Sequence, residues 1–481
     1  MSIEMGARAL DEDLLARELG NWRTSSRSGP AYLGLADGIR MLIVDGRLPV
    51  GARLPSERAL ADSLRVSRTT VTAAYTQLRE DGYLNARRGA RSTTALPVSG
   101  NTPVATQAAA TASLAEATLA APVGPMMDAF SDAARDVMPY LHDIGVELVG
   151  VAPLREAIAE RYCARGLPTE PDEIMVTTGA LHAIGLILAT YTQPGDRVLV
   201  EQPTYHGALS AITTCGARPV PVSMVDDGWE LDAIDAAVRQ LSPSLAYLVV
   251  DNHNPTGMTL SEAGRRRLGT IIAETRTRTI IDETIADMWL DRPVPAPMAA
   301  FMSSRRDLVL TIGSVSKSFW GGLRIGWIRA ERSTLATIAA VRPSIDMGTA
   351  IVEQLAAARV FGKADELLAE RRDILRHRRE LLRRLLREHL PDWSASESHG
   401  GMSLWVRLPA PTSSALSAAA SRLGLIIPPG PRFGVDGTLE RFIRVPYTLP
   451  DERLEEAVEL LARAWHSVTG TAVPEPTALV V

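Results

Sequence analysis

The residue that stands out first for its chemistry is Lys317. The 481-residue chain has 51 basic residues, of which Lys317 and Lys363 are the only lysines. Lys317 follows the apolar run DLVLTIG, which has the length and composition of a buried strand. An amine at the end of such a strand is desolvated, and burial favours the neutral form that attacks carbonyl groups. Any lysine-dependent covalent step is therefore expected at Lys317.

Polar residues on both sides of Lys317 match the needs of a phosphorylated carbonyl compound. Ser314 and Ser316 precede the lysine and Arg324 follows it, and hydroxyl and guanidinium groups are good phosphate donors. Asp282 ends the strand-like run RTIID. A carboxylate there can hold the proton of a pyridine nitrogen and make the ring an electron sink. Together these groups predict pyridoxal phosphate as the cofactor.

From about Pro139 to the last helix, the chain resembles the fold type I pyridoxal-phosphate aminotransferases. The resemblance rests on the ordered motifs TTGA, PTY, NPTG, IIDE, SxSK, GLRIG and IRV. It implies that Lys317 forms the internal aldimine and that Arg444 clamps a substrate carboxylate as a bidentate pair. The other cofactor-binding residues that it implies are Gly179 and Ala180 through backbone N–H groups, Tyr205 by ring stacking, Asn254 and Asp282 at the ring, and Ser314, Ser316 and Arg324 at the phosphate.

The chain departs from this family pattern at two places. Thr284 and Ile285 stand where many relatives have a tyrosine that bonds to the phenolic oxygen of the cofactor. Val146 stands where relatives often have a tyrosine that reaches the phosphate of the opposite subunit. These departures favour retained cofactor binding over full transaminase turnover.

The elements that position these residues follow from an alternation of apolar runs and amphipathic stretches. The runs that read as buried strands are EIMVTTGA, DRVLVEQP, RPVPVSM, LAYLVVDNHNPTG, RTIIDET, DLVLTIGS and RIGWIRA. Their alternation with helices predicts a mainly parallel sheet covered on both faces. Residues 331–390 read as mainly helical, and a smaller α+β unit follows. Residues 126–481 exceed what one core usually supports, so we expect a large and a small domain there.

Positive charge is concentrated near the N-terminus. Residues 22–91 hold twelve arginines and six acidic residues, whereas the whole chain has a formal charge of −5. A basic head, residues 1–91, thus precedes an acidic body, residues 126–481. This asymmetry predicts a polyanionic partner for the head alone.

The head has the pattern of a helix followed by a helix-turn-helix. Residues 31–44 predict one amphipathic helix, Ser56 is the expected N-cap of a short helix ending at Leu64, and Ser67 that of the next helix. The apolar spacing in this last helix leaves Arg68 on the outer face of its N-terminus. That part of a helix-turn-helix enters the major groove of DNA.

Residues 46–92 resemble the winged helix-turn-helix of the GntR regulators, most specifically in the motifs LPSER and VSRTTV. Arginine can bridge guanine O6 and N7, and hydroxyl groups and arginines hold phosphates. The wing lacks the second glycine of a frequent G-x-G pattern. The residues that the resemblance places at DNA are Arg58, Arg68, Thr69, Thr70 and Thr72, with Arg88 and Gly89 at the wing tip.

Residues 92–125 join the two parts and contain Glu116 as their only charged residue. They are rich in Ala, Thr, Pro and Ser and have no sustained periodicity. The sequence predicts a flexible linker, and a coil of this length spans about 30 Å. Such a span would let the head move relative to the body.

Head, linker and body in this order resemble the MocR/GabR regulators across the entire chain. The resemblance implies a domain-swapped homodimer whose cofactor sites lie near the subunit interface and whose heads bind separated DNA sites. It implies transcriptional control by a pyridoxal-phosphate-dependent sensor of an amine, an amino acid or free pyridoxal phosphate. Ligand binding would shift the open and closed populations of the body and reposition the heads.

Two alternatives to a regulator remain open at this point. One is a working aminotransferase with a DNA-binding appendage, which steady keto acid formation would reveal. The other is a DNA-binding protein with a decayed body, a reading that the retained Lys317, Asp282 and Asn254 oppose.

Composition also predicts where the protein works. No apolar stretch reaches the roughly 18 residues needed to span a bilayer, and the charged first thirty residues are unlike a signal peptide. A cytoplasmic location is expected. Cys163 and Cys215 are the only cysteines and lack metal-ligand spacing, so we expect neither a disulfide framework nor a metal site.

Overall fold

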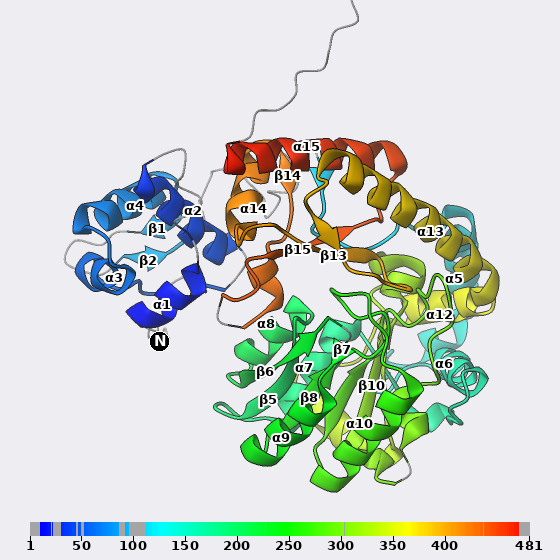
Figure 1. The fold of residues 1–481 in the computed structure, drawn as a ribbon. Helices are drawn as coiled ribbons and strands as arrows, with labels where there is room; N and C mark the ends of the chain where they lie inside the picture. The colour runs from blue at the N-terminus through cyan, green and yellow to red at the C-terminus, as the bar shows by residue number, and fades with distance from the viewer. Residues whose placement is uncertain are drawn as a thin grey trace, which may run out of the picture.

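The computed structural model describes residues 10–20, 22, 30–44, 47–49, 52–85, 92–95, 112–226, 228–302, 304–435 and 437–470. A small N-terminal head lies beside a two-part body, in which a small domain packs on a large domain (Figure 1). One apolar core fills the head, and two larger ones fill the body. The predicted combination of a winged helix-turn-helix head with an α/β body is confirmed.

The head is built from four helices and a short hairpin. Ser56 accepts a hydrogen bond from Ala59 N at 3.2 Å and Ser67 accepts one from Thr70 N at 3.1 Å, so both predicted N-caps are present. The elements are α1 (Glu12–Leu19), α2 (Ala31–Val44), α3 (Glu57–Leu64), α4 (Arg68–Glu80), β1 (Leu84–Asn85) and β2 (Thr93–Thr94), with β1 and β2 antiparallel.

The large domain contains an eight-stranded sheet in the order β4-β11-β10-β9-β8-β5-β6-β7. The central pairs from β10 to β6 are parallel, and the pairs at both edges are antiparallel. Along β5, Leu199 belongs to one apolar core while Val198 and Val200 belong to the other, so the sheet is covered on both faces as predicted. The strands are β4 (Ile174–Thr177), β5 (Arg197–Gln202), β6 (Arg218–Val225), β7 (Gly228–Trp229), β8 (Leu245–Leu248), β9 (Thr279–Asp282), β10 (Val309–Ser314) and β11 (Gly326–Arg329).

Helices connect these strands, and a small domain follows them. The helices of the large domain and of the connection are α5 (Val123–Asp136), α6 (Ala152–Ala164), α7 (Ala180–Tyr191), α8 (His206–Thr214), α9 (Leu231–Leu241), α10 (Glu262–Thr275), α11 (Arg332–Val341) and α12 (Ile351–Phe361). The small domain has the sheet β12-β13-β15. Its elements are α13 (Ala364–His389), β12 (Ser394–Ala395), β13 (Ser403–Arg407), α14 (Ser413–Arg422), β14 (Leu425–Ile426), β15 (Phe442–Pro446) and α15 (Asp451–Thr469).

Part of the expected linker is ordered on the body. Strand β3 (Ala112–Ser113) pairs in parallel with β14 of the small domain, and the side chains of Leu114 and Leu119 are buried. We call residues 112–122 the covering segment. The expectation of a flexible coil is not met here. The free energy gained by burying these apolar side chains on the body outweighs the conformational entropy that a free chain would keep.

The head rests on the small domain of its own chain. Helix α2 packs against α14, and Figure 1 shows the head beside α14, away from the large sheet. Arg422 Nη1 of α14 lies 3.3 Å from Asp37 Oδ2 of α2. Gly437 has a φ of +68°, and a side chain there would collide with the carbonyl of Arg17 at the end of α1. The head is thus in direct contact with the small domain.

Two kinds of structure do not occur in the part of the chain that the structure describes. None of the helices there combines the length and apolarity needed to cross a membrane. In the same ranges, no group of three or more His, Cys, Asp or Glu side chains is arranged to hold a metal ion.

Candidate functional site

A cavity of about 760 Å³ lies where the ends of the central strands meet the small domain and the covering segment. This edge of a mainly parallel sheet is where ligands bind in α/β proteins. The fold brings the predicted body residues together here, although their motifs are far apart in sequence. Those that line the cavity are Ala180, Tyr205, Asn254, Asp282, Ser314, Ser316, Lys317, Arg324 and Arg444.

Lys317 lies directly after β10, in the short π-helix Ser316–Trp320. Its Nζ donates a hydrogen bond to the carbonyl oxygen of Ala117 at 2.8 Å. Burial first, and then the positive charge of Arg444, lower the pKa of Lys317 to about 8. At pH 7 on the order of one tenth of this amine is therefore neutral and nucleophilic, far more than for an exposed lysine.

Asp282 is held in place at the end of β9 by two donors. Tyr247 Oη donates to its Oδ2 at 2.7 Å, and the backbone N–H of Thr284 donates to its Oδ1 at 2.9 Å. Burial raises the pKa of the Tyr247 phenol well above its ordinary value, and the negative charge of Asp282 raises it further. Tyr247 therefore remains a donor, and it fixes the carboxylate that the sequence assigned to a pyridine nitrogen.

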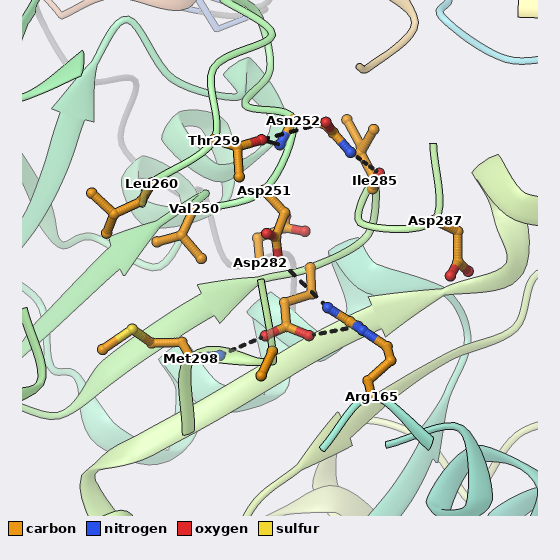
Figure 2. Close-up of polar contacts among 12 residues, drawn as sticks. Arg165, Val250, Asp251, Asn252, Thr259, Leu260, Asp282, Ile285, Asp287 and Met298 are labelled. Carbon is orange, nitrogen blue, oxygen red and sulfur yellow. Dashed lines mark hydrogen bonds and ion pairs between the residues drawn. The ribbon is translucent and has the colours of Figure 1, made fainter. Parts of the chain in front are cut away.

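A buried ion network supports the strand end behind Asp282 (Figure 2). Arg165 Nη1 donates to Glu283 Oε2 at 3.0 Å, and Met298 N donates to Glu283 Oε1 at 3.1 Å. Arg265 forms a fully buried ion pair with Asp251. Removing one partner leaves a buried charge without a counterion, and this destabilises the fold by more than the intact pair stabilises it. We infer that the network holds the strand ends at a fixed geometry.

Asn252 links the loop after β8 to the loop after β9. Its backbone N–H donates to Thr259 Oγ1 at 3.0 Å, and its side-chain Nδ2 donates to the carbonyl of Ile285 at 3.0 Å (Figure 2). Ile285 and Thr284, which replace the tyrosine of many relatives, both line the cavity. The loop therefore still borders the cavity, but it provides no phenolic hydroxyl there.

One end of the cavity has the features of a phosphate site. Gly179 is the N-cap of α7 with a φ of +88° and no side-chain cap, so N–H groups of the first turn of α7 point toward the cavity end. Arg324 Nη2 donates to the carbonyl of Thr178 at 3.2 Å, and a Cβ on Gly179 would lie 2.7 Å from the same nitrogen. Only glycine allows this approach, and the cradle fits a phosphate group.

The two predicted serines complete this end of the cavity. Ser314 Oγ lies 2.9 Å from Ser316 Oγ and accepts the backbone N–H of Ser316 at 3.1 Å. Hydroxyl groups and a guanidinium beside a helix N-terminus form a donor set suited to a dianion. These phosphate donors, the amine of Lys317 and the carboxylate of Asp282 together fit the phosphate, the aldehyde and the ring nitrogen of pyridoxal phosphate.

Arg444 of β15 also lines the cavity. Its Nη1 donates to Asn254 Oδ1 at 3.3 Å, and its Nη2 donates to the carbonyl of Ala115. The guanidinium carbon lies 5.1 Å from the centre of the Phe433 ring. Burial first, and then the charge of neighbouring Arg432, lower the pKa of Arg444 to about 10. Its buried Nε has no hydrogen-bond partner among the described residues, so donor capacity remains for an anion.

Tyr205 lies at the N-terminus of α8 with its ring centre 5.0 Å from that of His206. Burial raises the pKa of Tyr205, and the charge of Asp282 raises it further. Tyr205 and Asp282 line the same cavity, which agrees with the stacking role that the family resemblance implies.

Several residues of the cavity carry no signal that sequence reasoning could use. The covering segment places the carbonyls of Ala115 and Ala117 on Arg444 and Lys317. Backbone acceptors can come from any residue type, so the motifs do not reveal them. The other lining residues that the motifs did not indicate include His206 and Arg432 of the body and Arg40, Met41 and Tyr83 of the head.

The predicted DNA-facing residues of the head differ in their exposure. The side chains of Arg58 and Arg68 are 86% and 72% exposed. Thr72 Oγ1 instead donates to Glu57 Oε2 at 2.8 Å and is only partly exposed. Arg68 is also near Glu57, at 3.8 Å. The two arginines are therefore the more accessible donors for a polyanion.

The N-terminal turn of α4 also carries two hydroxyl groups. Thr69 Oγ1 and Thr70 Oγ1 each lie 2.8 Å from Ser67 Oγ. The predicted wing-tip residues, Arg88 and Gly89, lie outside the described residues.

Comparisons with known proteins agree with both halves of the structure. A family model for aminotransferases of class I and II matches residues 144–461, and one for bacterial regulatory proteins of the gntR family matches residues 31–93. The uncharacterized HTH-type transcriptional regulator YdcR of Escherichia coli (strain K12) is 29% identical over 464 residues, covering 90% of this chain and 98% of YdcR.

Two further proteins illustrate the range of relatives. The probable rhizopine catabolism regulatory protein MocR of Rhizobium meliloti is 28% identical over 410 residues, covering 79% of this chain and 82% of MocR. The crystal structure of LysN, an alpha-aminoadipate aminotransferase of Thermus thermophilus, matches with a TM-score of 0.69 at 24% identity. It covers 75% of this chain and 93% of LysN, and this likeness concerns the fold alone.

Proposed function

We propose that this chain, which belongs to the class I and II aminotransferase family and carries a GntR-type DNA-binding domain, is a transcriptional regulator controlled by a ligand of its body. In this proposal the body binds pyridoxal phosphate covalently through Lys317 and senses an amine, an amino acid or pyridoxal phosphate itself. The observation that carries it is that a segment from between head and body contacts both Lys317 and Arg444.

The residues of the cavity have distinct roles in this proposal. Gly179, Ala180, Ser314, Ser316 and Arg324 would hold the phosphate, and Asp282 would hold the proton on the pyridine nitrogen. Tyr205 would cover the ring, Asn254 would donate to the phenolic oxygen, and Arg444 would bind a ligand carboxylate. When bound, the cofactor supplies an aldehyde that combines with amines and a ring that withdraws electrons.

The covering segment offers a route from ligand to head. Lys317 and Arg444 now donate to the carbonyl oxygens of Ala117 and Ala115. A ligand whose amine reaches Lys317 and whose carboxylate reaches Arg444 competes with these carbonyls for the same two side chains. Its binding would therefore displace the covering segment, which follows the head in the chain. A ligand shifts a conformational equilibrium only through such a difference in contacts between two states.

The head would bind operator DNA through the N-terminus of α4 and the wing. Arg58 and Arg68 are highly exposed there, which supports contacts with bases or phosphates. Thr69, Thr70 and Thr72 would add hydroxyl donors, and Arg88 and Gly89 would form the wing tip. The division into head (1–91), connection (92–125) and body (126–481) is part of the same proposal.

A homodimer is the assembly that we propose. Exposed apolar side chains gather in one stretch of the chain along α5 and the residues after it, and exposed patches of this kind mark protein interfaces. In a domain-swapped dimer, the head surface that contacts α14 of its own chain would contact the small domain of the partner subunit instead. The exposed apolar residues of this stretch are Val123, Met127, Met138, Leu141 and Ile144.

A working aminotransferase is the second candidate, because every predicted cofactor residue except Gly179 lines the cavity. Incubation of the cofactor-loaded protein with common amino acids and a keto acid acceptor distinguishes the two. We expect a spectral response to the ligand without steady keto acid formation, because Thr284 and Ile285 replace the expected tyrosine. Sustained turnover would establish the enzyme instead.

A further inference from the structure

A second cavity, of about 410 Å³, lies in the small domain. It is bordered by the last turns of α13, by β12 and by the residues that lead from β12 to β13. The part of its wall that the structure describes includes none of the residues assigned to the cofactor or its ligand. The volume is in the range of small-molecule sites in proteins. We call it the second cavity, and the one around Lys317 the Lys317 cavity.

Part of the wall of the second cavity is apolar. The side chains of Leu386 on α13 and Val406 on β13 are buried, and both line this cavity. Trp393 also lines it, with its ring centre 5.3 Å from that of Trp465. Apolar side chains of this kind favour a ligand with an apolar body, because that body leaves water when it binds.

Two buried polar atoms of the same wall have no hydrogen-bond partner among the described residues. They are Trp393 Nε1 and Ser398 Oγ, and Ser398 is only 3% exposed. An indole N–H can only donate, and a hydroxyl group can donate. Because a buried donor without an acceptor is costly, the ligand group that fits beside these atoms is a hydrogen-bond acceptor.

The charged groups of the wall differ in whether they already have a partner. Asp291 accepts hydrogen bonds from Arg379 at 2.6 and 2.8 Å, and Arg383 forms an ion pair with a neighbouring glutamate of α13. Arg387 and Glu397 are exposed and are paired neither with each other nor with another described residue. Water can solvate the exposed carboxylate. The free guanidinium adds to the two buried donors, so the wall favours an anion, and one carboxylate matches one guanidinium as a bidentate pair.

The residues that line the second cavity also contact the loop that bears Asn254. Ser396 Oγ donates to the carbonyl oxygen of Thr256 at 3.2 Å. A side chain on Gly257 would collide with the side chain of Ser398. Asn254 and Gly257 both line the Lys317 cavity. The segment 396–398 therefore connects the two cavities through direct contacts.

We propose that the second cavity is a further ligand site, for an organic carboxylate with an apolar body, and that its occupancy changes binding in the Lys317 cavity. The carboxylate would accept hydrogen bonds from Arg387, Trp393 Nε1 and Ser398 Oγ. The bound ligand would hold Ser398, and with it Gly257 and the loop, in one position. Such a coupling between two sites acts in both directions.

Phenylacetate and its neutral isostere phenylacetamide test the site by calorimetric titration of the full-length protein. The titration uses Arg444→Met, which removes the proposed carboxylate donor of the Lys317 cavity. We expect the acid to bind roughly tenfold more tightly than the amide, because charge-assisted bonds replace neutral ones. Adding Arg387→Gln should reduce this ratio to near one. Adding Arg384→Gln, at an exposed arginine of α13 that is not among the lining residues, should leave the ratio unchanged.

Equilibrium dialysis with pyridoxal phosphate, with and without saturating phenylacetate, tests the coupling. In the protein without substitutions we expect the affinity for pyridoxal phosphate to change by about fivefold or more, the lower end of typical couplings. In Arg387→Gln this change should disappear.

Equal affinity for acid and amide, or a preference for the acid that survives in Arg387→Gln, would overturn the site. An affinity for pyridoxal phosphate that phenylacetate leaves unchanged would overturn the coupling. A protein that takes up no pyridoxal phosphate would refute the proposed function and the coupling with it, whereas the calorimetric comparison would still decide whether the second cavity is a site.

Discussion

Lys317 Nζ donates a hydrogen bond to the carbonyl oxygen of Ala117 at 2.8 Å. These residues are 200 positions apart, and the bond joins the residue expected to bind the cofactor to the segment that connects head and body. In this contact the amine of Lys317 donates to a neutral acceptor. The hydrogen bond therefore stabilises the covering segment only as long as no other group binds the amine of Lys317.

The covalent cofactor adduct should depend on Lys317 alone. Reduction with borohydride in the presence of pyridoxal phosphate should trap one adduct per chain in the wild type and none in Lys317→Ala, because burial keeps this amine nucleophilic. Mass spectrometry of the reduced protein measures it. Lys363→Ala is the matched control and should be trapped like the wild type. The opposite pattern for the two variants would refute the assignment of the body site.

Adduct formation should follow the lowered pKa of Lys317. The neutral amine is the reactive form, and the pKa is lowered from 10.5 to about 8. The rate of trapping in the cofactor-free protein should therefore rise as pH increases through about 8 and fall as pH decreases through it. Stopped-flow absorbance across pH 6–10, a range of about two units either side of that pKa, measures the midpoint.

Two variants should move this midpoint in opposite directions. Arg444→Met removes a positive charge that disfavours the protonated amine, so the midpoint should move to higher pH. Glu116→Gln removes a negative charge that favours the protonated amine, so the midpoint should move to lower pH. Shifts of the same sign in both variants would contradict the proposed electrostatics of the cavity.

Asp282 should determine how firmly the cofactor is held. Asp282→Ala leaves the pyridine nitrogen without its acid and should lower the affinity for pyridoxal phosphate by roughly 1.5–3 kcal/mol, the range for a hydrogen bond to a charged group. Equilibrium dialysis measures the loss. Tyr247→Phe removes only a donor to this carboxylate and should cost less. Unchanged affinity in Asp282→Ala would argue against its place in the site.

The two expected DNA-contacting arginines should behave differently. Arg68→Ala should cost about 1–3 kcal/mol of binding, mostly at one base position, if the side chain bridges a guanine. Arg88→Ala should weaken all sequences alike and reduce the salt slope by about one unit, as expected for a phosphate contact. Titration of a DNA fragment from upstream of the protein's own gene, at several salt concentrations, measures both. Wild-type affinity in both variants would remove the basis for a DNA site in residues 56–91.

Much of the fold and part of the site could be predicted, because both depend on local patterns. Apolar runs predicted the strands, and the ends of β9 and β10 predicted the convergence of Asp282 and Lys317. Tyr247 was missed because it reads as one more apolar strand residue. Its contact follows from register: Tyr247 pairs with Ile280, and Asp282 lies two residues further along the same face.

The covering segment could not be predicted for a different reason. Its low charge and small side chains are typical of a linker, and its order comes from nonlocal contacts such as the pairing of Ala112 with Leu425. Arg432 was missed because a single arginine in a turn has no motif. In both cases the function-relevant property is a position in the folded cavity, which no residue spacing encodes.

The central claim is that occupancy of the Lys317 site controls DNA binding by the head. The most direct test is the affinity of the full-length, cofactor-loaded protein for its upstream fragment, measured with and without a ligand that changes the cofactor spectrum. We predict that the ligand changes this affinity in the wild type and has no effect in Lys317→Ala, which should still bind the fragment. An affinity that the ligand leaves unchanged in the wild type would contradict the account.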